Sequence, residues 1–120
     1  MTKRILVAGC RSYNNYEDAK IFIEQSISKL KEEHTIIFVS GYCKGADMLG
    51  EKYALENHYK IERYPANWAV FGKAAGPKRN KLMAEVADYV ICFWDGSSKG
   101  TKSLINYVDK LNKPLFIKYI

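Results

Sequence analysis

The sequence predicts a three-layer, doubly wound α/β fold with about five parallel strands flanked by helices. Short apolar runs alternate with helical patterns along the whole chain, and the strand runs are continuous and rich in β-branched residues. Strand, helix and strand in repeated order imply parallel pairing through right-handed crossovers. No repeat, low-complexity tract or linker interrupts the pattern, so residues 1–120 are predicted to form a single domain.

The first half of the chain predicts two strands, each followed by a helix. A short apolar run that ends at Gly9 predicts the first strand, and an apolar stripe at helical spacing predicts the helix after it. A second continuous apolar run predicts the next strand. The expected elements are Ile5–Ala8, Tyr16–Lys31 with Ala19, Ile23, Ile27 and Leu30 facing inward, Thr35–Ser40, and Ala46–Glu56.

The second half predicts three more strands and two more helices. A short strand ends at Pro65, and a long connection leads from there to a helix. An apolar run, a glycine-rich turn and an amphipathic helix follow before the last strand. The expected elements are Lys60–Tyr64, Lys78–Val86 with Leu82, Met83 and Val86 inward, Tyr89–Trp94, a helix after Thr101 with Leu104, Ile105, Val108 and Leu111 on one face, and Pro114–Tyr119.

Composition indicates a globular protein of the cytoplasm. The 120 residues are 48% hydrophobic, yet no apolar run approaches the roughly 20 residues that a bilayer span needs. The chain leads straight into a strand pattern, so we expect no signal peptide. The cysteines, Cys10, Cys43 and Cys92, are odd in number and far apart, without metal-type spacing, which favours a reducing compartment.

One segment has a marked charge asymmetry within a chain of net charge +6. From Arg63 to Ala84 there is no Asp or Glu, although five cations fall there. Such a segment favours an anionic partner, either a phosphorylated small molecule or a nucleic-acid backbone. A solvated basic loop that aids solubility is the alternative. The cations are Arg63, Lys73, Lys78, Arg79 and Lys81.

The turn from Asp95 to Thr101 is the strongest indication of a ligand site. It joins the end of a buried strand to the start of a helix, where free N–H groups and the helix dipole favour an anion such as phosphate. Its glycines let the backbone approach a ligand, and its hydroxyl groups can donate hydrogen bonds. The residues predicted to bind are Asp95, Gly96, Ser97, Ser98, Gly100 and Thr101.

Three other segments should meet this turn at the carboxyl edge of the sheet, where doubly wound folds bind ligands. They supply glycines, cations and polar side chains suited to anions. Asp47 lies in a first helical turn, where a structural role is as well supported as contact with a ribose hydroxyl or action as a base. Trp68 and Phe71 would either stack on a base or pin the long connection. The predicted binding residues here are Gly9, Arg11, Ser12, Gly41, Lys44, Gly45, Asp47, Trp68, Lys73, Arg79 and Asn80.

The motifs at these turns resemble the YspA-like branch of the SLOG superfamily. They are Gly9-x-Arg11-x-Tyr13, Ser40-Gly41 with Lys44-Gly45-Ala46-Asp47, Pro65-Ala66-Asn67-Trp68 with Gly72-Lys73-Ala74-Ala75-Gly76-Pro77-x-Arg79-Asn80, and Gly100-Thr101. The resemblance covers nearly the whole chain. It implies a Rossmann-like fold and a nucleotide-derived ligand.

Relatives in that superfamily imply two kinds of activity. LOG phosphoribohydrolases cut the N-glycosidic bond of nucleoside monophosphates, and Arg79-Asn80 with the Asp95–Thr101 turn is similar to their pattern. Leu104 stands where that pattern has Glu, so a carboxylate role would fall to Asp95 or Asp47. DprA, another relative, handles single-stranded DNA.

We therefore expect a domain that binds a nucleotide or a nucleotide-derived phosphorylated ligand at the carboxyl edge of the sheet. If the chain is an enzyme, N-glycosidic hydrolysis is the expected reaction, with Arg79 and Asp95 as the catalytic candidates. The alternative is a single-stranded nucleic-acid-binding module of the DprA type, with Trp68, Phe71 and Tyr13 as stacking platforms. No metal or other cofactor and no membrane contact is expected, and self-association is a further expectation.

Overall fold

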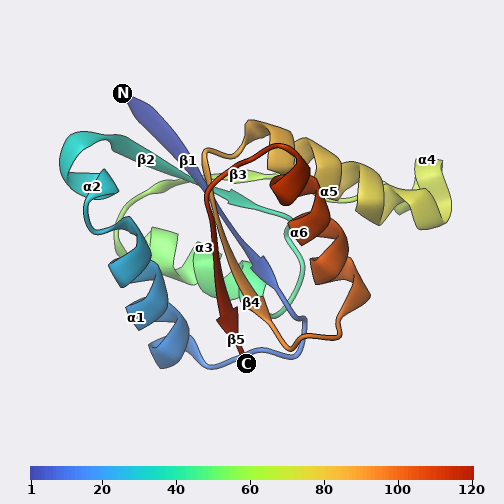
Figure 1. Ribbon diagram of the computed structural model, residues 1–120, viewed down its shortest axis with the longest axis horizontal. Helices are drawn as coiled ribbons and strands as arrows, with labels where there is room; N and C mark the ends of the chain where they lie inside the picture. Colours follow the sequence, from blue (N-terminus) through green and yellow to red (C-terminus); the bar gives the residue numbers. More distant parts are fainter.

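The structure, a computed structural model, describes residues 1–120 and contains one five-stranded sheet. All neighbouring strands are parallel, in the order β3-β2-β1-β4-β5. This arrangement, with helices on both faces, confirms the predicted Rossmann-like α/β fold (Figure 1). The strands are β1 (Thr2–Gly9), β2 (Thr35–Ser40), β3 (Lys60–Arg63), β4 (Tyr89–Trp94) and β5 (Leu115–Tyr119).

The helices form the two outer layers. One face of the sheet is covered by α1 and α3, and the other by α5 and α6 (Figure 1). No helix is long and apolar enough to cross a membrane. The helices are α1 (Tyr16–Ile27), α2 (Leu30–Glu33), α3 (Ala46–Glu56), α4 (Trp68–Phe71), α5 (Ala75–Val86) and α6 (Lys99–Lys110), with a 3-10 turn η1 (Gly72–Ala74) between α4 and α5.

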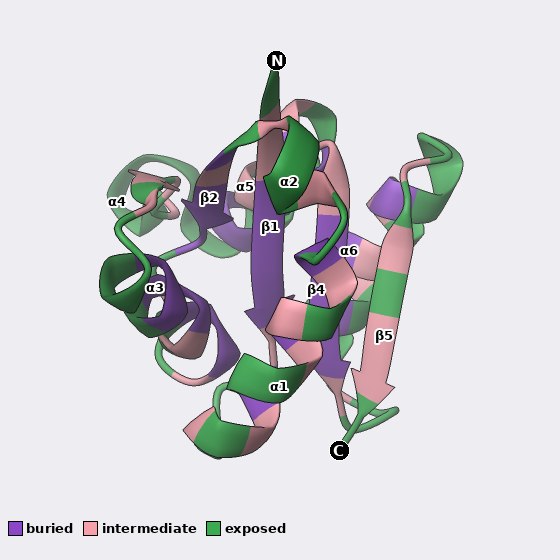
Figure 2. Cartoon of the chain, turned by 90° about the vertical axis from the view of Figure 1, so that its left-hand side faces the viewer, coloured by how far each residue is buried: buried purple, intermediate pink, exposed green.

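Strand side chains alternate between two hydrophobic clusters, one on each face of the sheet. In β1, Ile5 and Val7 pack with the residues of α1 and α3, whereas Leu6 and Ala8 pack with those of α5 and α6. Because both faces are covered, the central strands are buried along most of their length, while β5 at the edge is partly exposed (Figure 2). This explains why the central strands read as unbroken apolar runs.

The topology places a crevice above β1 and β4. From β1 the chain moves to β2 and β3 on one side, and then crosses back to β4 on the other side of β1. Connections on the two sides of this switch point diverge, which leaves space at the carboxyl ends of the strands. Gly9 allows the two strands to stay close there, because a Cβ at this position would lie 2.2 Å from the Phe93 carbonyl oxygen.

Two predicted helices differ from the observed ones. The helix expected at Tyr16–Lys31 ends at Ile27, and α2 follows as a separate turn. Near the break, the hydroxyls of Ser26 and Ser28 donate to backbone carbonyls of the preceding turn, which competes with the helical ladder. The segment expected to be a long loop before Lys78 instead forms α4, η1 and the start of α5 at Ala75.

Some predicted orientations are also wrong. Leu82 was expected to face inward but is 47% exposed, and Ala84 is buried in its place. Leu111 lies at the end of α6 and is exposed rather than part of its inner face. The glycine turn is shorter than expected, because α6 begins at Lys99 and Gly100 is already helical. Only Gly96 in that turn has a positive φ, +85°.

Candidate functional site

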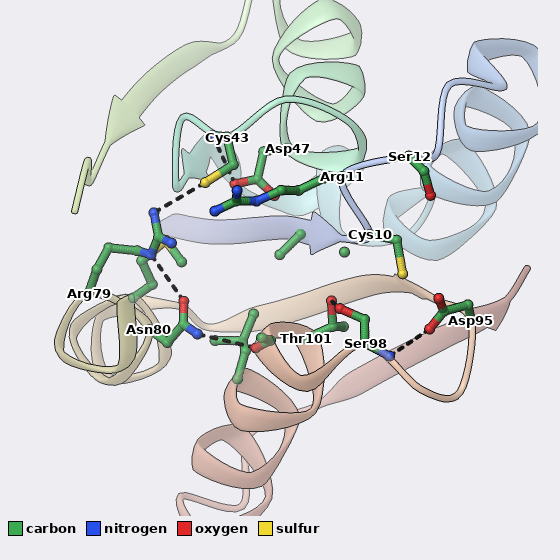
Figure 3. Close-up of a pocket in the computed structure, with 15 residues that line it drawn as sticks. Cys10, Arg11, Ser12, Cys43, Asp47, Arg79, Asn80, Asp95, Ser98 and Thr101 are labelled. Atoms are coloured by element: carbon green, nitrogen blue, oxygen red, sulfur yellow. Dashed lines mark hydrogen bonds between the residues drawn. The ribbon is translucent and has the colours of Figure 1, made fainter. Parts of the chain in front are cut away.

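A cleft of about 440 Å³ opens at the carboxyl edge of the sheet, at the switch point between β1 and β4. This volume lies in the range of small-molecule sites. The turns after β1, β2 and β4, together with α5, supply its walls (Figure 3). The predicted binding residues that line the cleft are Gly9, Arg11, Ser12, Asp47, Arg79, Asn80, Asp95, Ser98, Gly100 and Thr101.

Two arginines bring positive charge into the cleft. Arg79 reaches from α5 to the turn after β2, where its Nη1 donates to the Gly41 carbonyl oxygen at 2.8 Å. Its Nε donates to Asn80 Oδ1 at 3.0 Å, so the guanidinium is held from two sides. Arg11 extends from the turn after β1 into the same space (Figure 3). A pair of guanidinium groups at one wall suits a phosphate or carboxylate ligand.

Asp47 is the buried carboxylate of the site. It is 5% exposed, and its Oδ2 accepts a hydrogen bond from the Cys43 N–H at 3.3 Å. Burial raises the pKa of Asp47 to about 6, and the nearby Glu51 carboxylate raises it as well. The Cys43 N–H, Arg79 and Arg11 oppose that shift without cancelling it. A carboxyl group that titrates near neutral pH can exchange a proton with a bound ligand.

The opposite wall is the amino end of α6. Asn80 Nδ2 donates to the Gly100 carbonyl oxygen at 3.3 Å, which fixes this end of α6 against α5. The first helical N–H to find a partner is that of Lys102, which donates to Ser98, so the N–H groups before it have no partner within the helix. Neither a capping side chain nor an acidic residue occupies this end. An anion in the cleft would accept hydrogen bonds from these N–H groups.

Asp95 has an environment opposite to that of Asp47. It is exposed, and its Oδ1 accepts hydrogen bonds from the N–H groups of Ser97 at 2.9 Å and Ser98 at 2.8 Å. These bonds hold the pKa of Asp95 below its usual value. The carboxylate therefore stays ionised and shapes the turn before α6. It lines the cleft as a fixed negative charge rather than as a proton carrier.

The glycines after β2 are required by close contacts around the site. A Cβ at Gly41 would lie 2.7 Å from Asp47 Oδ2 and 3.0 Å from Arg79 Nη1. A Cβ at Gly45, where φ is +89°, would lie 2.4 Å from the Cys10 carbonyl oxygen. Gly41 and Gly45 thus support the wall without lining the cleft.

Other predicted residues lie outside the cleft. Trp68 is 53% exposed on α4, and its ring lies close above Gly76, so it pins α4 to the start of α5. Tyr13 was expected as a stacking platform, but its ring packs on Phe93 at 5.0 Å and its hydroxyl donates to Asp18. The Tyr13 ring therefore packs against the hydrophobic core instead of offering a stacking surface. Lys44, Lys73, Gly96 and Ser97 also lie outside the cleft.

Five lining residues were not predicted. Leu104 lies one helical turn after Thr101, and Met83 lies one turn after Asn80, so helical spacing from the predicted residues could have identified both. Cys43 also lines the cleft, with its Sγ 3.6 Å from Arg79 Nη1. The others are Ala8 and Cys10. No group of three or more His, Cys, Asp or Glu side chains is arranged to hold a metal ion.

Similar folds occur in proteins of known structure. DNA processing protein A (DprA) from Streptococcus pneumoniae has a TM-score of 0.72 and 20% identity over 98% of this chain and 50% of that chain. DprA from Helicobacter pylori, in a structure that describes its single-stranded DNA binding mode, has a TM-score of 0.69 and 22% identity over 96% of this chain and 64% of that chain. The protein TM1055 has a TM-score of 0.66 and 16% identity over 96% of this chain and 72% of that chain. At these identities the likeness establishes the fold.

The chain therefore spans about half the length of the S. pneumoniae protein. No curated protein sequence matches it. The model of a sequence family described as the YspA, cpYpsA-related SLOG family matches residues 3–71, which is more than half of the chain and includes the turns after β1, β2 and β3. The chain belongs to this family of SLOG proteins, as the motifs at its carboxyl edge predict.

Proposed function

We propose that this protein binds a nucleotide, or another phosphorylated ligand derived from a nucleotide, with the phosphate in the cleft at the switch point. The observation that carries the proposal is the convergence of Arg11, Arg79 and the uncapped amino end of α6 on one cavity. Each of these favours negative charge, and the three come from distant parts of the sequence. Membership in the SLOG family supports a nucleotide-type ligand.

The cleft also holds groups that suit the rest of such a ligand. Asp47 and Asn80 are polar side chains at the walls, and both are largely buried. A buried carboxylate can accept hydrogen bonds from the hydroxyls of a ribose. Met83 and Leu104 give part of the lining an apolar character that matches a sugar or base face. Three free cysteines agree with a role in the reducing cytoplasm.

N-glycosidic hydrolysis is the reaction we propose to test first. Arg79 would bind the ligand, and a carboxylate would serve as the acid or base. Of the two candidates, Asp47 has the better matched pKa, about 6, because a general acid or base works best near the ambient pH. Incubation with nucleoside monophosphates, followed by chromatography for the free base, tests the reaction. Release that survives Asp95→Asn but is lost in Asp47→Asn would assign the role to Asp47.

The binding proposal is tested by titrating the protein calorimetrically with nucleoside monophosphates, ADP-ribose and NAD. Arg79→Ala should weaken the binding of a ligand at least about tenfold, because it removes a charged donor from a partly desolvated site. Lys81→Ala is the matched control. Lys81 is an exposed cation on the same helix that does not line the cleft, so its loss should change affinity less than about twofold. Equal losses in both variants, or no binding of any of these ligands, would contradict the proposal.

Single-stranded nucleic acid is a second candidate ligand, favoured by one separate observation. Lys73, Lys78 and Lys81 are exposed cations on η1 and α5, close to the exposed aromatic residues Trp68 and Phe71 of α4. Such a surface can contact successive phosphates and stack bases. Here the affinity for a short single strand should fall steeply with salt, and each lysine should contribute. Binding that depends on Arg79 alone argues for the small-molecule site.

A further inference from the structure

A second cavity, of about 290 Å³, adjoins the cleft at the carboxyl end of β3. Its walls come from the segment after β3, from α4 and from α5. Arg79 lines both cavities, so the two lie on either side of one side chain.

The lining of this cavity combines apolar surface with positive charge. Phe71 is 46% exposed and Leu82 is 47% exposed, although both are large apolar side chains. Lys78 makes no salt bridge, and its Nζ lies 5.0 Å from the centroid of the Phe71 ring. No carboxylate lines the cavity. The lining therefore suits a ligand in which a planar or apolar group is attached to a negatively charged group.

The cavity is held in shape by local contacts. Asn67 caps α4 by accepting the Val70 N–H on its Oδ1 at 3.2 Å, so its amide nitrogen is left to donate elsewhere. The Trp68 ring packs close to Gly76, where a Cβ would lie only 3.3 Å from the ring. An aromatic ring, a free amide donor and a cation in one small space are the groups with which proteins bind nucleobases.

We propose that this second cavity is the base subsite of the nucleotide whose phosphate occupies the cleft. The inference rests on the proposed function, which it extends from the phosphate to the base. The base would lie against Phe71 and Leu82, and Asn67 would face its polar edge. Arg79, at the shared wall, would contact the part of the ligand that passes from one cavity to the other.

The experiment compares ribose 5-phosphate with the four common nucleoside monophosphates, by calorimetry on the full chain. Ribose 5-phosphate reports the cleft alone, whereas the difference between a nucleotide and ribose 5-phosphate reports the base. In the wild type, at least one nucleotide should bind about tenfold more tightly than ribose 5-phosphate, as expected for one stacked base. Phe71→Ala should remove most of that difference and leave the affinity for ribose 5-phosphate unchanged. Leu82→Ala should act in the same direction.

Val70→Ala provides the matched control, because Val70 is a more exposed apolar residue of the same helix that does not line the cavity. It should leave every affinity unchanged. Equal affinity of ribose 5-phosphate and all four nucleotides would overturn the base subsite while leaving the proposed phosphate site intact. An equal effect of Val70→Ala and Phe71→Ala, or a loss of ribose 5-phosphate binding in Phe71→Ala, would also overturn it. Absence of binding for all five compounds would overturn the base subsite, and the titrations with ADP-ribose and NAD would then decide the proposed function.

Discussion

The turn between β2 and α3 and the turn between β4 and α6 are alike in sequence and opposite in construction. Each joins a buried strand to a helix at the same edge of the sheet, and each segment, counted through the first two residues of its helix, contains two glycines and one aspartate. Protein atoms crowd both glycines of the first turn, at 2.7 Å or less from the position of a Cβ. In the second turn, nothing lies within 4 Å of a Cβ at Gly96 or Gly100.

The two turns therefore contribute to the site in different ways. In the first turn, neighbouring protein atoms fill the space around the glycines. This packing holds Asp47 and the Arg79 guanidinium in fixed positions around Gly41. The second turn is open, and the start of α6 at Gly100 lines space that a ligand can enter. The same glycine-rich composition thus serves dense packing in one place and access in the other.

Replacing one glycine in each turn tests this comparison with the largest expected effect. Gly45→Ala should lower the free energy of unfolding by at least about 3 kcal/mol, because the Cβ meets backbone atoms and φ is +89°. Gly96→Ala, at a φ of +85° but in open space, should cost only about 1–2 kcal/mol. Urea unfolding of both variants measures the difference. Equal losses would mean that the positive φ, rather than crowding, sets the cost in both turns.

The two aspartates should respond to pH in opposite ways. The pKa of Asp47 in the folded chain, about 6, lies above its ordinary value of 3.8, so the folded protein loses stability as the pH rises between these values. Asp47→Asn should therefore raise the free energy of unfolding at pH 8, by up to about 3 kcal/mol, and should have little effect near pH 3.

Asp95→Asn is the opposing case in the same series. Its pKa is lowered by the hydrogen bonds from Ser97 and Ser98, so the ionised form stabilises the folded chain. The variant should be less stable than the wild type at neutral pH, and the deficit should vanish as the pH falls through the lowered pKa. Urea unfolding from pH 3 to pH 8 checks both variants. Parallel pH profiles would contradict the contrast between the two carboxylates.

Of these variants, Gly100→Ala should change the stability least, and it should weaken ligand binding. Gly100 is helical and has open space around it, so alanine should stabilise the chain by about 0.4–1 kcal/mol. The added methyl group enters the cleft wall, and the affinity for a phosphorylated ligand should fall. Thermal unfolding and calorimetry with the same protein sample give the two values. A gain in stability with unchanged affinity would argue that the phosphate does not contact this end of α6.

The sequence was a good guide to the elements that local patterns specify. Continuous apolar runs predicted the central strands β1, β2 and β4, the short segment before Pro65 predicted β3, and the alternation with helices predicted the parallel pairing. Helix limits were less predictable, because local hydrogen bonds, such as those from the Ser26 and Ser28 hydroxyls, compete with the helical ladder near the end of α1. Leu82 was misplaced because the burial of a helix face depends on which neighbours that face meets, and Met83 and Ala84 are the residues of α5 that are buried there.

The candidate site divides in the same way. By itself, the sequence determined which residue types stand at the carboxyl ends of the strands, since glycine, arginine and aspartate at strand ends are local features of the chain. Only the tertiary structure decided that Arg79 bridges from α5 to Gly41, that Trp68 lies outside the cleft, and that Asp47 rather than Asp95 is the buried carboxylate. Burial and pKa depend on atoms brought together from distant segments, and spacing along one strand or helix carries no record of them.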